Sequence, residues 1–124
     1  MTRVILVEDH DHMRQCLKLM VEKIKPCKVV AEAPCGVLAI DTIENTPADL
    51  ILLDLSLPRV SGIDVLKCIR PKTKAKILAV TLFTDDQTIR AALDAGADGI
   101  FSKEKGGSDL KAAIVEVLSG QILN

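Results

Sequence analysis

The sequence Leu50-Ile51-Leu52-Leu53-Asp54 places four apolar residues in a row directly before a carboxylate. A strand that is apolar at every position is buried on both faces, as strands inside parallel sheets are. Similar short runs occur at Val4–Val7, Val29–Ala31, Ile77–Val80 and Gly99–Ser102. Five such runs separated by helical segments predict an α/β fold, in which a parallel sheet is covered by helices on both faces.

The segments between these runs have helical periodicity. In the first of them, the apolar residues from Met13 to Ile24 form one continuous helix face, which Pro26 ends. The last helix is predicted to begin at a cap made by Ser108 or Asp109. Three further helices are predicted over Gly36–Asn45, over Ile63–Arg70 with Pro71 as the stop, and from the cap Thr84-Asp85-Asp86 to Ala95. One domain is expected over residues 1–124, of which 117–124 form the end of the last helix and the start of a linker.

Composition narrows the class of protein. Hydrophobic residues make up 48% of the 124 residues, which is ample for one core and excludes disorder. Sixteen Lys and Arg oppose seventeen Asp and Glu, so no overall basic field favours direct binding of nucleic acid by this chain. The longest apolar runs, of about four residues, are too short for a membrane span. Four cysteines without metal-site spacing predict reduced thiols and a cytoplasmic location.

Polar residues stand at the ends of four predicted strands. These are Glu8 and Asp9 after the first, Asp54 after the third, Thr81 after the fourth and Lys103 after the fifth. The carboxyl ends of parallel strands form the ligand-binding rim of an open sheet, so these residues are expected to converge. Alone, each could be a helix cap, a turn residue or a solvated charge. Together they suit phosphoryl transfer to a carboxylate.

Each residue has a role in that chemistry. Three clustered carboxylates require a divalent cation, and oxygen ligands suit Mg²⁺. Asp54 can act as the nucleophile and form an acyl phosphate. Thr81 can donate a hydrogen bond to one phosphoryl oxygen, and Lys103 can pair with another.

A family resemblance rests on these same residues. The Glu8-Asp9 pair, the run Asp54-Leu55-Ser56-Leu57-Pro58 with Gly62, and then Thr81 and Lys103 resemble the receiver domain of bacterial response regulators. The resemblance implies a flavodoxin-like (βα)5 doubly wound sheet with strand order 2-1-3-4-5, and phosphorylation of Asp54 by a histidine kinase. It also implies metal ligation by Asp9, Asp54 and the main-chain carbonyl of Ser56, with Glu8 acting through water.

Finer features suggest a subtype. His10 after the acidic pair, and the segment 110–120, resemble regulators of the LuxR/NarL type, which carry a helix-turn-helix after the receiver. Output would then be a switch in partner binding or homodimer formation, with DNA contacted only by a C-terminal domain outside this chain. Ile100 departs from the aromatic residue usual at its position, which puts the usual aromatic signalling route in doubt. His10 and His12 are interpreted as solvated loop residues.

Two other functions compete with this one. A Mg²⁺-dependent phosphohydrolase of the haloacid-dehalogenase kind needs a second Asp two positions after the nucleophile, where this chain has Ser56. That class also needs a substrate-covering cap, so an enzyme acting on free substrates is not expected. A degenerate receiver, used as an unphosphorylated binding module, stays open because of Ile100.

Overall fold

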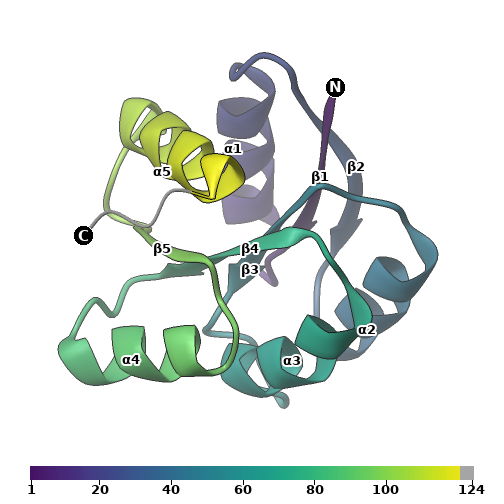
Figure 1. The fold of residues 1–124 in the computed structure, drawn as a ribbon, viewed down its shortest axis with the longest axis vertical. Coiled ribbons are helices and arrows are strands. Elements are labelled where there is room, and N and C mark those ends of the chain that lie inside the picture. Colours follow the sequence, from purple (N-terminus) through teal and green to yellow (C-terminus); the bar gives the residue numbers. More distant parts are fainter. Residues whose placement is uncertain (121–124) are drawn as a thin grey trace.

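The computed structural model describes residues 1–120 as a five-stranded parallel sheet with helices on both faces (Figure 1). The strand order β2-β1-β3-β4-β5 confirms the predicted flavodoxin-like topology. The elements are β1 (Thr2–Val7), α1 (Asp11–Glu22), β2 (Cys27–Ala33), α2 (Gly36–Asn45), β3 (Leu50–Asp54), α3 (Gly62–Ile69), the 3₁₀ turn η1 (Arg70–Lys72), β4 (Lys76–Thr81), α4 (Asp86–Asp94), β5 (Gly99–Ser102) and α5 (Gly107–Ser119).

The central strand β3 is buried at every position, as its sequence predicts. Its register pairs Leu50–Leu53 with Val4–Val7 on one side and with Lys76–Ala79 on the other. Helices α1 and α5 cover one face of the sheet, and α2, α3 and α4 cover the other (Figure 1). Because helices cover both faces, polar residues that flank the strands can come together only at the two edges of the sheet where the strands begin and end. We call the second of these edges the carboxyl rim.

Ile100 and Phe101 lie on opposite faces of β5. Ile100 is partly buried against the core shared with α3 and α4, whereas Phe101 is buried in the core beneath α1 and α5. The chain thus has an aromatic residue in β5, but one position later than the family pattern and on the other face of the sheet.

Several predicted boundaries need correction. The strand predicted at Val29–Ala31 runs from Cys27 to Ala33, because β2 is an edge strand whose exposed positions interrupt the apolar pattern. The prediction that Ser108 or Asp109 caps the last helix is wrong. That helix begins at Gly107, and the extended residue Gly106 precedes it without a side-chain cap. Residues 121–124 of the predicted linker lie outside the described residues.

The third helix also differs slightly from its prediction. It begins at Gly62 and ends at Ile69, followed by the 3₁₀ turn that contains Pro71. Proline has no N–H to continue the α-helical pattern, so the chain tightens at that point. The cap predicted before α4 is confirmed at Asp85, whose side chain accepts from the Thr88 N–H.

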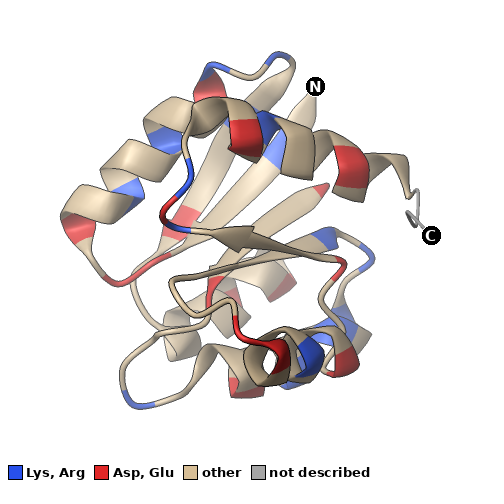
Figure 2. Cartoon of the chain, turned by 90° about the vertical axis from the view of Figure 1, so that its left-hand side faces the viewer, with Lys and Arg blue, Asp and Glu red and all other residues tan. Residues whose placement is uncertain are grey.

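Figure 2 shows that charged residues of both signs are interspersed over the helices and loops, while the strands between their ends are nearly free of charge. The four cysteines are free, as the sequence suggested. Within residues 1–120, no helix has the length and hydropathy that a bilayer span requires.

Candidate functional site

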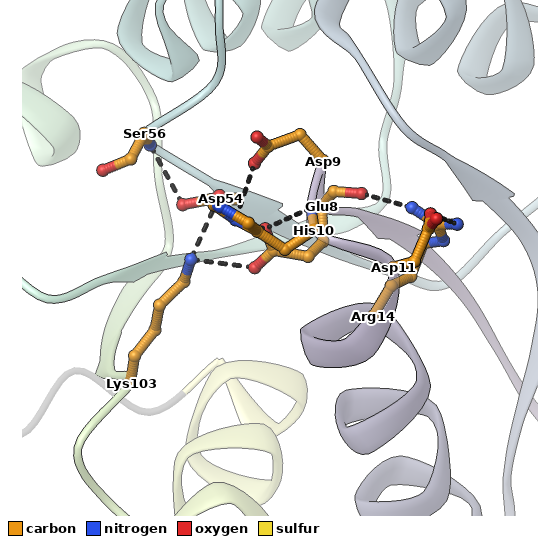
Figure 3. Close-up of polar contacts among 8 residues, drawn as sticks. All are labelled: Glu8, Asp9, His10, Asp11, Arg14, Asp54, Ser56 and Lys103. Carbon is orange, nitrogen blue, oxygen red and sulfur yellow. Dashed lines mark hydrogen bonds and ion pairs between the residues drawn. The ribbon is translucent and has the colours of Figure 1, made fainter.

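The strand ends bring Glu8, Asp54 and Lys103 into direct contact at the carboxyl rim (Figure 3). Asp54 is the last residue of β3 and its residue surface is 1% exposed; Glu8, just after β1, is fully buried. The ammonium of Lys103, which follows β5, lies 2.8 Å from Glu8 Oε1 and 3.1 Å from Asp54 Oδ2. Three distant segments of the sequence therefore meet at one buried cluster.

The carboxylates of this cluster are incompletely satisfied. Glu8 Oε1, Asp9 Oδ1 and Asp54 Oδ2 are buried and have no hydrogen-bond partner. Lys103 is within ion-pair distance of two of these atoms, but it does not meet hydrogen-bond geometry with either. Buried carboxylate oxygens in native proteins are normally paired, so three of them together indicate a site built for a further cationic group.

Burial raises the pKa of Glu8, and the neighbouring Asp54 raises it further, while Lys103 opposes both. For Lys103, burial acts to lower the pKa, but its contacts with Glu8 and Asp54 outweigh burial and raise it. The lysine therefore stays charged, and its single charge does not offset the effect of burial on the pKa of Glu8.

The loop after β3 orients Asp54. The Ser56 N–H donates to Asp54 Oδ1 at 2.9 Å, which leaves Oδ2 directed at Lys103. Gly62 holds this loop close, because a Cβ there would lie 2.3 Å from the Leu55 Cα and 2.5 Å from the Asp54 carbonyl oxygen. The Gly62 N–H also donates to the Leu55 carbonyl at 3.1 Å. Any larger residue at this position would displace the aspartate.

Thr81 is fully buried at the end of β4, beside the cluster in the sheet. Its Oγ1 accepts a hydrogen bond from the Phe83 N–H at 2.9 Å, and its carbonyl accepts from the Lys103 N–H at 2.9 Å. The hydroxyl is thus tied to the loop after β4, where the Phe83 side chain is exposed. A movement of the Thr81 hydroxyl would therefore shift that loop, because the two are joined by a hydrogen bond.

Asp9 is less buried than its neighbours, with 22% of its side chain exposed. It meets the imidazole of His10, whose Nδ1 lies 3.4 Å from Asp9 Oδ1 and 3.5 Å from Glu8 Oε2. The prediction of His10 as a solvated loop residue is confirmed, because its side chain is 73% exposed and it precedes α1. The sequence did not predict that one ring nitrogen faces the acidic pair. The one available signal was its position directly after Asp9.

Arg14 is a second residue that the sequence did not reveal. Its Nη1 donates to the Glu8 carbonyl at 2.8 Å, and its Nη2 donates to Asp11 at 2.6 Å (Figure 3). These contacts fasten the acidic loop to the first turn of α1. An arginine in an amphipathic helix gives no sequence signal of such a role.

Comparison with known proteins agrees with this geometry. The family model described as "Response regulator receiver domain" matches residues 4–115. Response regulator UvrY of Escherichia coli is 34% identical over 98% of this chain. The match covers 56% of UvrY, so the chain spans just over half the length of this curated relative.

Solved structures give the same assignment. A LuxR-family two-component response regulator from Aurantimonas superposes with a TM-score of 0.92 at 31% identity, covering 97% of this chain and 86% of that one. The isolated receiver domain of RcsB from Salmonella enterica, solved with the phosphomimetic BeF3⁻, superposes with a TM-score of 0.88 at 25% identity, covering 98% of this chain and 91% of that one. The chain therefore belongs to the response regulator receiver domain family and is the receiver domain of a two-component response regulator.

Proposed function

We propose that Asp54 is the phosphoacceptor of this domain, that a histidine kinase is the donor, and that a divalent cation at Glu8, Asp9, Asp54 and Ser56 assists the transfer. One observation carries the proposal: Asp54 Oδ2 is buried at the ligand-binding rim, without a hydrogen bond and 3.1 Å from Lys103. A buried structural aspartate would normally have both carboxylate oxygens hydrogen-bonded, whereas in Asp54 only Oδ1 accepts, from the Ser56 N–H.

The charge of the cluster supports a divalent cation. Three carboxylates and one ammonium sum to −3 + 1 = −2 within the rim, and three carboxylate oxygens lack hydrogen bonds. Asp9, Asp54 and the Ser56 carbonyl would hold the ion, with Glu8 acting through water. Oxygen ligands of this kind suit Mg²⁺, which would neutralise charge on the transferring phosphoryl oxygens.

The residues of the chain perform the remaining steps. A carboxylate oxygen of Asp54 forms a bond to phosphorus as the P–N bond of a phosphohistidine donor breaks, and the departing imidazole nitrogen takes up a proton from solvent. The Ser56 N–H orients the carboxylate during this attack. Lys103 then pairs with a phosphoryl oxygen, because its ammonium already lies beside Asp54.

Thr81 would link phosphorylation to output. Its hydroxyl can donate its proton to a phosphoryl oxygen, while Oγ1 still accepts from the Phe83 N–H. The loop after β4 would move with it and alter partner binding or homodimer formation. Control of transcription would then need a DNA-binding domain beyond this chain, in keeping with relatives nearly twice its length. A signalling role of this kind, in the cytoplasm, does not include turnover of free substrates.

Intact-mass measurement tests the proposal. Incubation with Mg²⁺ and acetyl phosphate should add the mass of one phosphoryl group, labile in base, and Asp54→Asn should remove it. A phosphoryl group that persists in the substituted protein would overturn the assignment of Asp54. An unmodified wild-type protein would favour the unphosphorylated binding module, and steady hydrolysis of a phosphomonoester would favour the enzyme.

A further inference from the structure

His10 directs one ring nitrogen at the two carboxylates of the acidic loop. Its Nδ1 lies 3.4 Å from Asp9 Oδ1 and 3.5 Å from Glu8 Oε2, and its N–H donates to Glu8 Oε2 at 3.3 Å. One ligand atom from each of Glu8, Asp9 and His10 lies within 4.8 Å of the others. The residue is also the extended N-cap of α1, so the first turn of the helix fixes its position.

These separations match those of atoms that share a metal ion. With bonds of about 2.0–2.2 Å, adjacent ligand atoms stand roughly 3.0–3.5 Å apart in octahedral or tetrahedral geometry. A second observation concerns the atom that His10 faces: Asp9 Oδ1 is buried and has no hydrogen-bond partner, and neither has Oε1 of the fully buried Glu8. The arrangement therefore offers a nitrogen ligand beside an unsatisfied set of oxygens.

We infer that His10 is a metal ligand and that it makes this site prefer borderline divalent ions such as Co²⁺ and Zn²⁺ over Mg²⁺. The inference rests on the proposed cation site and extends it from oxygen ligands to an imidazole. Mg²⁺ keeps oxygen ligands and several waters, whereas imidazole is a favoured ligand of Zn²⁺ and its neighbours in the first transition series. The kind of ion that supports phosphorylation would then depend on His10.

An ion pair between a protonated His10 and the acidic loop would produce similar distances, but it makes the opposite prediction. In that case the imidazolium would compete with any metal for the carboxylates. Removing the ring would leave the affinity for Co²⁺ unchanged or increase it. The two explanations therefore predict opposite changes in Co²⁺ affinity when His10 is replaced by alanine.

His12 provides a matched control. It lies in the first turn of α1, two residues after His10, and its Nε2 lies 3.8 Å from Cys16 Sγ on the exposed side of the helix. His12 and Cys16 could themselves bind a borderline metal ion. Variants His12→Ala and Cys16→Ala therefore report any binding at that alternative position.

Metal binding can be measured directly, without activity. Bound Co²⁺ absorbs at visible wavelengths, where the protein itself is transparent, so a Co²⁺ titration follows binding directly. Mg²⁺ affinity would be measured by calorimetry on the same proteins. His10→Ala should lower the Co²⁺ affinity about 10-fold or more. It should change the Mg²⁺ affinity much less, while His12→Ala and Cys16→Ala should match the wild type.

Three results would overturn the inference. The first is a wild type that binds Co²⁺ no more tightly than Mg²⁺, and the second is a Co²⁺ affinity that His10→Ala leaves unchanged or raises. The third result is the loss of the Co²⁺ absorption in His12→Ala or Cys16→Ala. The phosphoryl mass gained by wild type with Mg²⁺ is recorded in parallel. If that mass is gained while the Co²⁺ prediction fails, only the role of His10 is wrong. If it is not gained while the Co²⁺ prediction holds, only the phosphoacceptor proposal is wrong.

Discussion

Two aspartates at opposite ends of the sheet are bonded differently. At the amino end, Asp98 Oδ2 accepts hydrogen bonds from the Ile77 N–H at 2.8 Å and from Arg70 at 3.0 Å. At the carboxyl end, Asp54 Oδ2 is buried and accepts none. Asp49, also at the amino end, accepts from the Arg3 N–H at 2.8 Å and from its guanidinium. Aspartates at the amino end are thus bonded to backbone and arginine together. At the carboxyl end, the carboxylates of Glu8 and Asp54 share one lysine, Lys103.

This difference separates a structural use of charge from a functional one. Arg70 donates to the carbonyls of Thr73, Ala75 and Gly96 as well as to Asp98, and so joins the strand starts of β4 and β5. A fully bonded network of this kind stabilises a fold. The carboxyl rim leaves three carboxylate oxygens without hydrogen-bond partners, which lowers the stability of the metal-free domain but provides a binding site.

The largest expected effect is therefore at the amino end. Arg70→Ala should lower the free energy of unfolding by about 2–3 kcal/mol, because it removes a charged group that makes four hydrogen bonds. Urea denaturation monitored by circular dichroism would measure the change. Lys72→Ala is the control: its ion pair with Glu44, at 2.7 Å, is exposed to solvent, so its loss should change the free energy of unfolding far less. Equal losses in the two variants would contradict the structural role of Arg70.

The carboxyl rim should respond to metal instead. Mg²⁺ at ten times its dissociation constant should stabilise the wild type by about 1.4 kcal/mol, because it binds only the folded carboxylate cluster. Asp9→Ala should abolish this gain and prevent phosphorylation at ordinary Mg²⁺ concentrations, yet keep the fold. Thermal denaturation with and without the ion gives the measurement. A melting temperature that millimolar Mg²⁺ leaves unchanged would mean that the cluster does not bind the ion.

Removing charge at the rim should have a smaller effect, opposite in sign to Arg70→Ala. In metal-free buffer, Asp54→Asn relieves repulsion with Glu8 and should leave the free energy of unfolding unchanged or raise it by up to about 1 kcal/mol. Urea denaturation of the chelator-treated protein would show this. A loss of stability comparable to that of Arg70→Ala would mean that the Asp54–Lys103 pair is structural.

Sequence reasoning could predict the rim but not the amino-end network. The apolar runs Val4–Val7 and Leu50–Leu53 show where two strands end. In a parallel sheet the carboxyl ends of the strands lie at one edge, which brings Glu8, Asp54 and Lys103 together. Three of the four partners of Arg70 are backbone carbonyls, the most distant of them 26 positions away at Gly96, and a carbonyl partner has no residue-type signature.

The errors have a similar physical origin. The α5 cap was assigned to Ser108 or Asp109 because their side chains can cap a helix, but Gly106 reaches the same extended conformation without one. His10 is exposed, as predicted, but the sequence did not show that its ring nitrogen faces the acidic pair. The orientation of its ring depends on how α1 begins, which only the three-dimensional arrangement reveals.

The smallest expected effect concerns pH at the amino end. Hydrogen bonds from the Arg3 side chain and backbone hold the pKa of Asp49 below its usual value of 3.8. A carboxylate whose pKa is lowered by folding stabilises the protein above the unfolded pKa, and the stabilisation is lost as the pH falls through the folded pKa. Since 40% of its side chain is exposed, solvent screening limits the contribution to about 0.5 kcal/mol or less.

The difference in unfolding free energy between wild type and Asp49→Asn should therefore shrink between pH 7 and pH 3. Arg3→Gln should show the same trend, because it removes the other partner of the pair. Urea denaturation at both pH values gives the comparison, and added salt should reduce the pH 7 difference. A difference that grows as the pH falls would show that Asp49 is not stabilised in its charged form, and that the contrast between the two ends of the sheet does not extend to this aspartate.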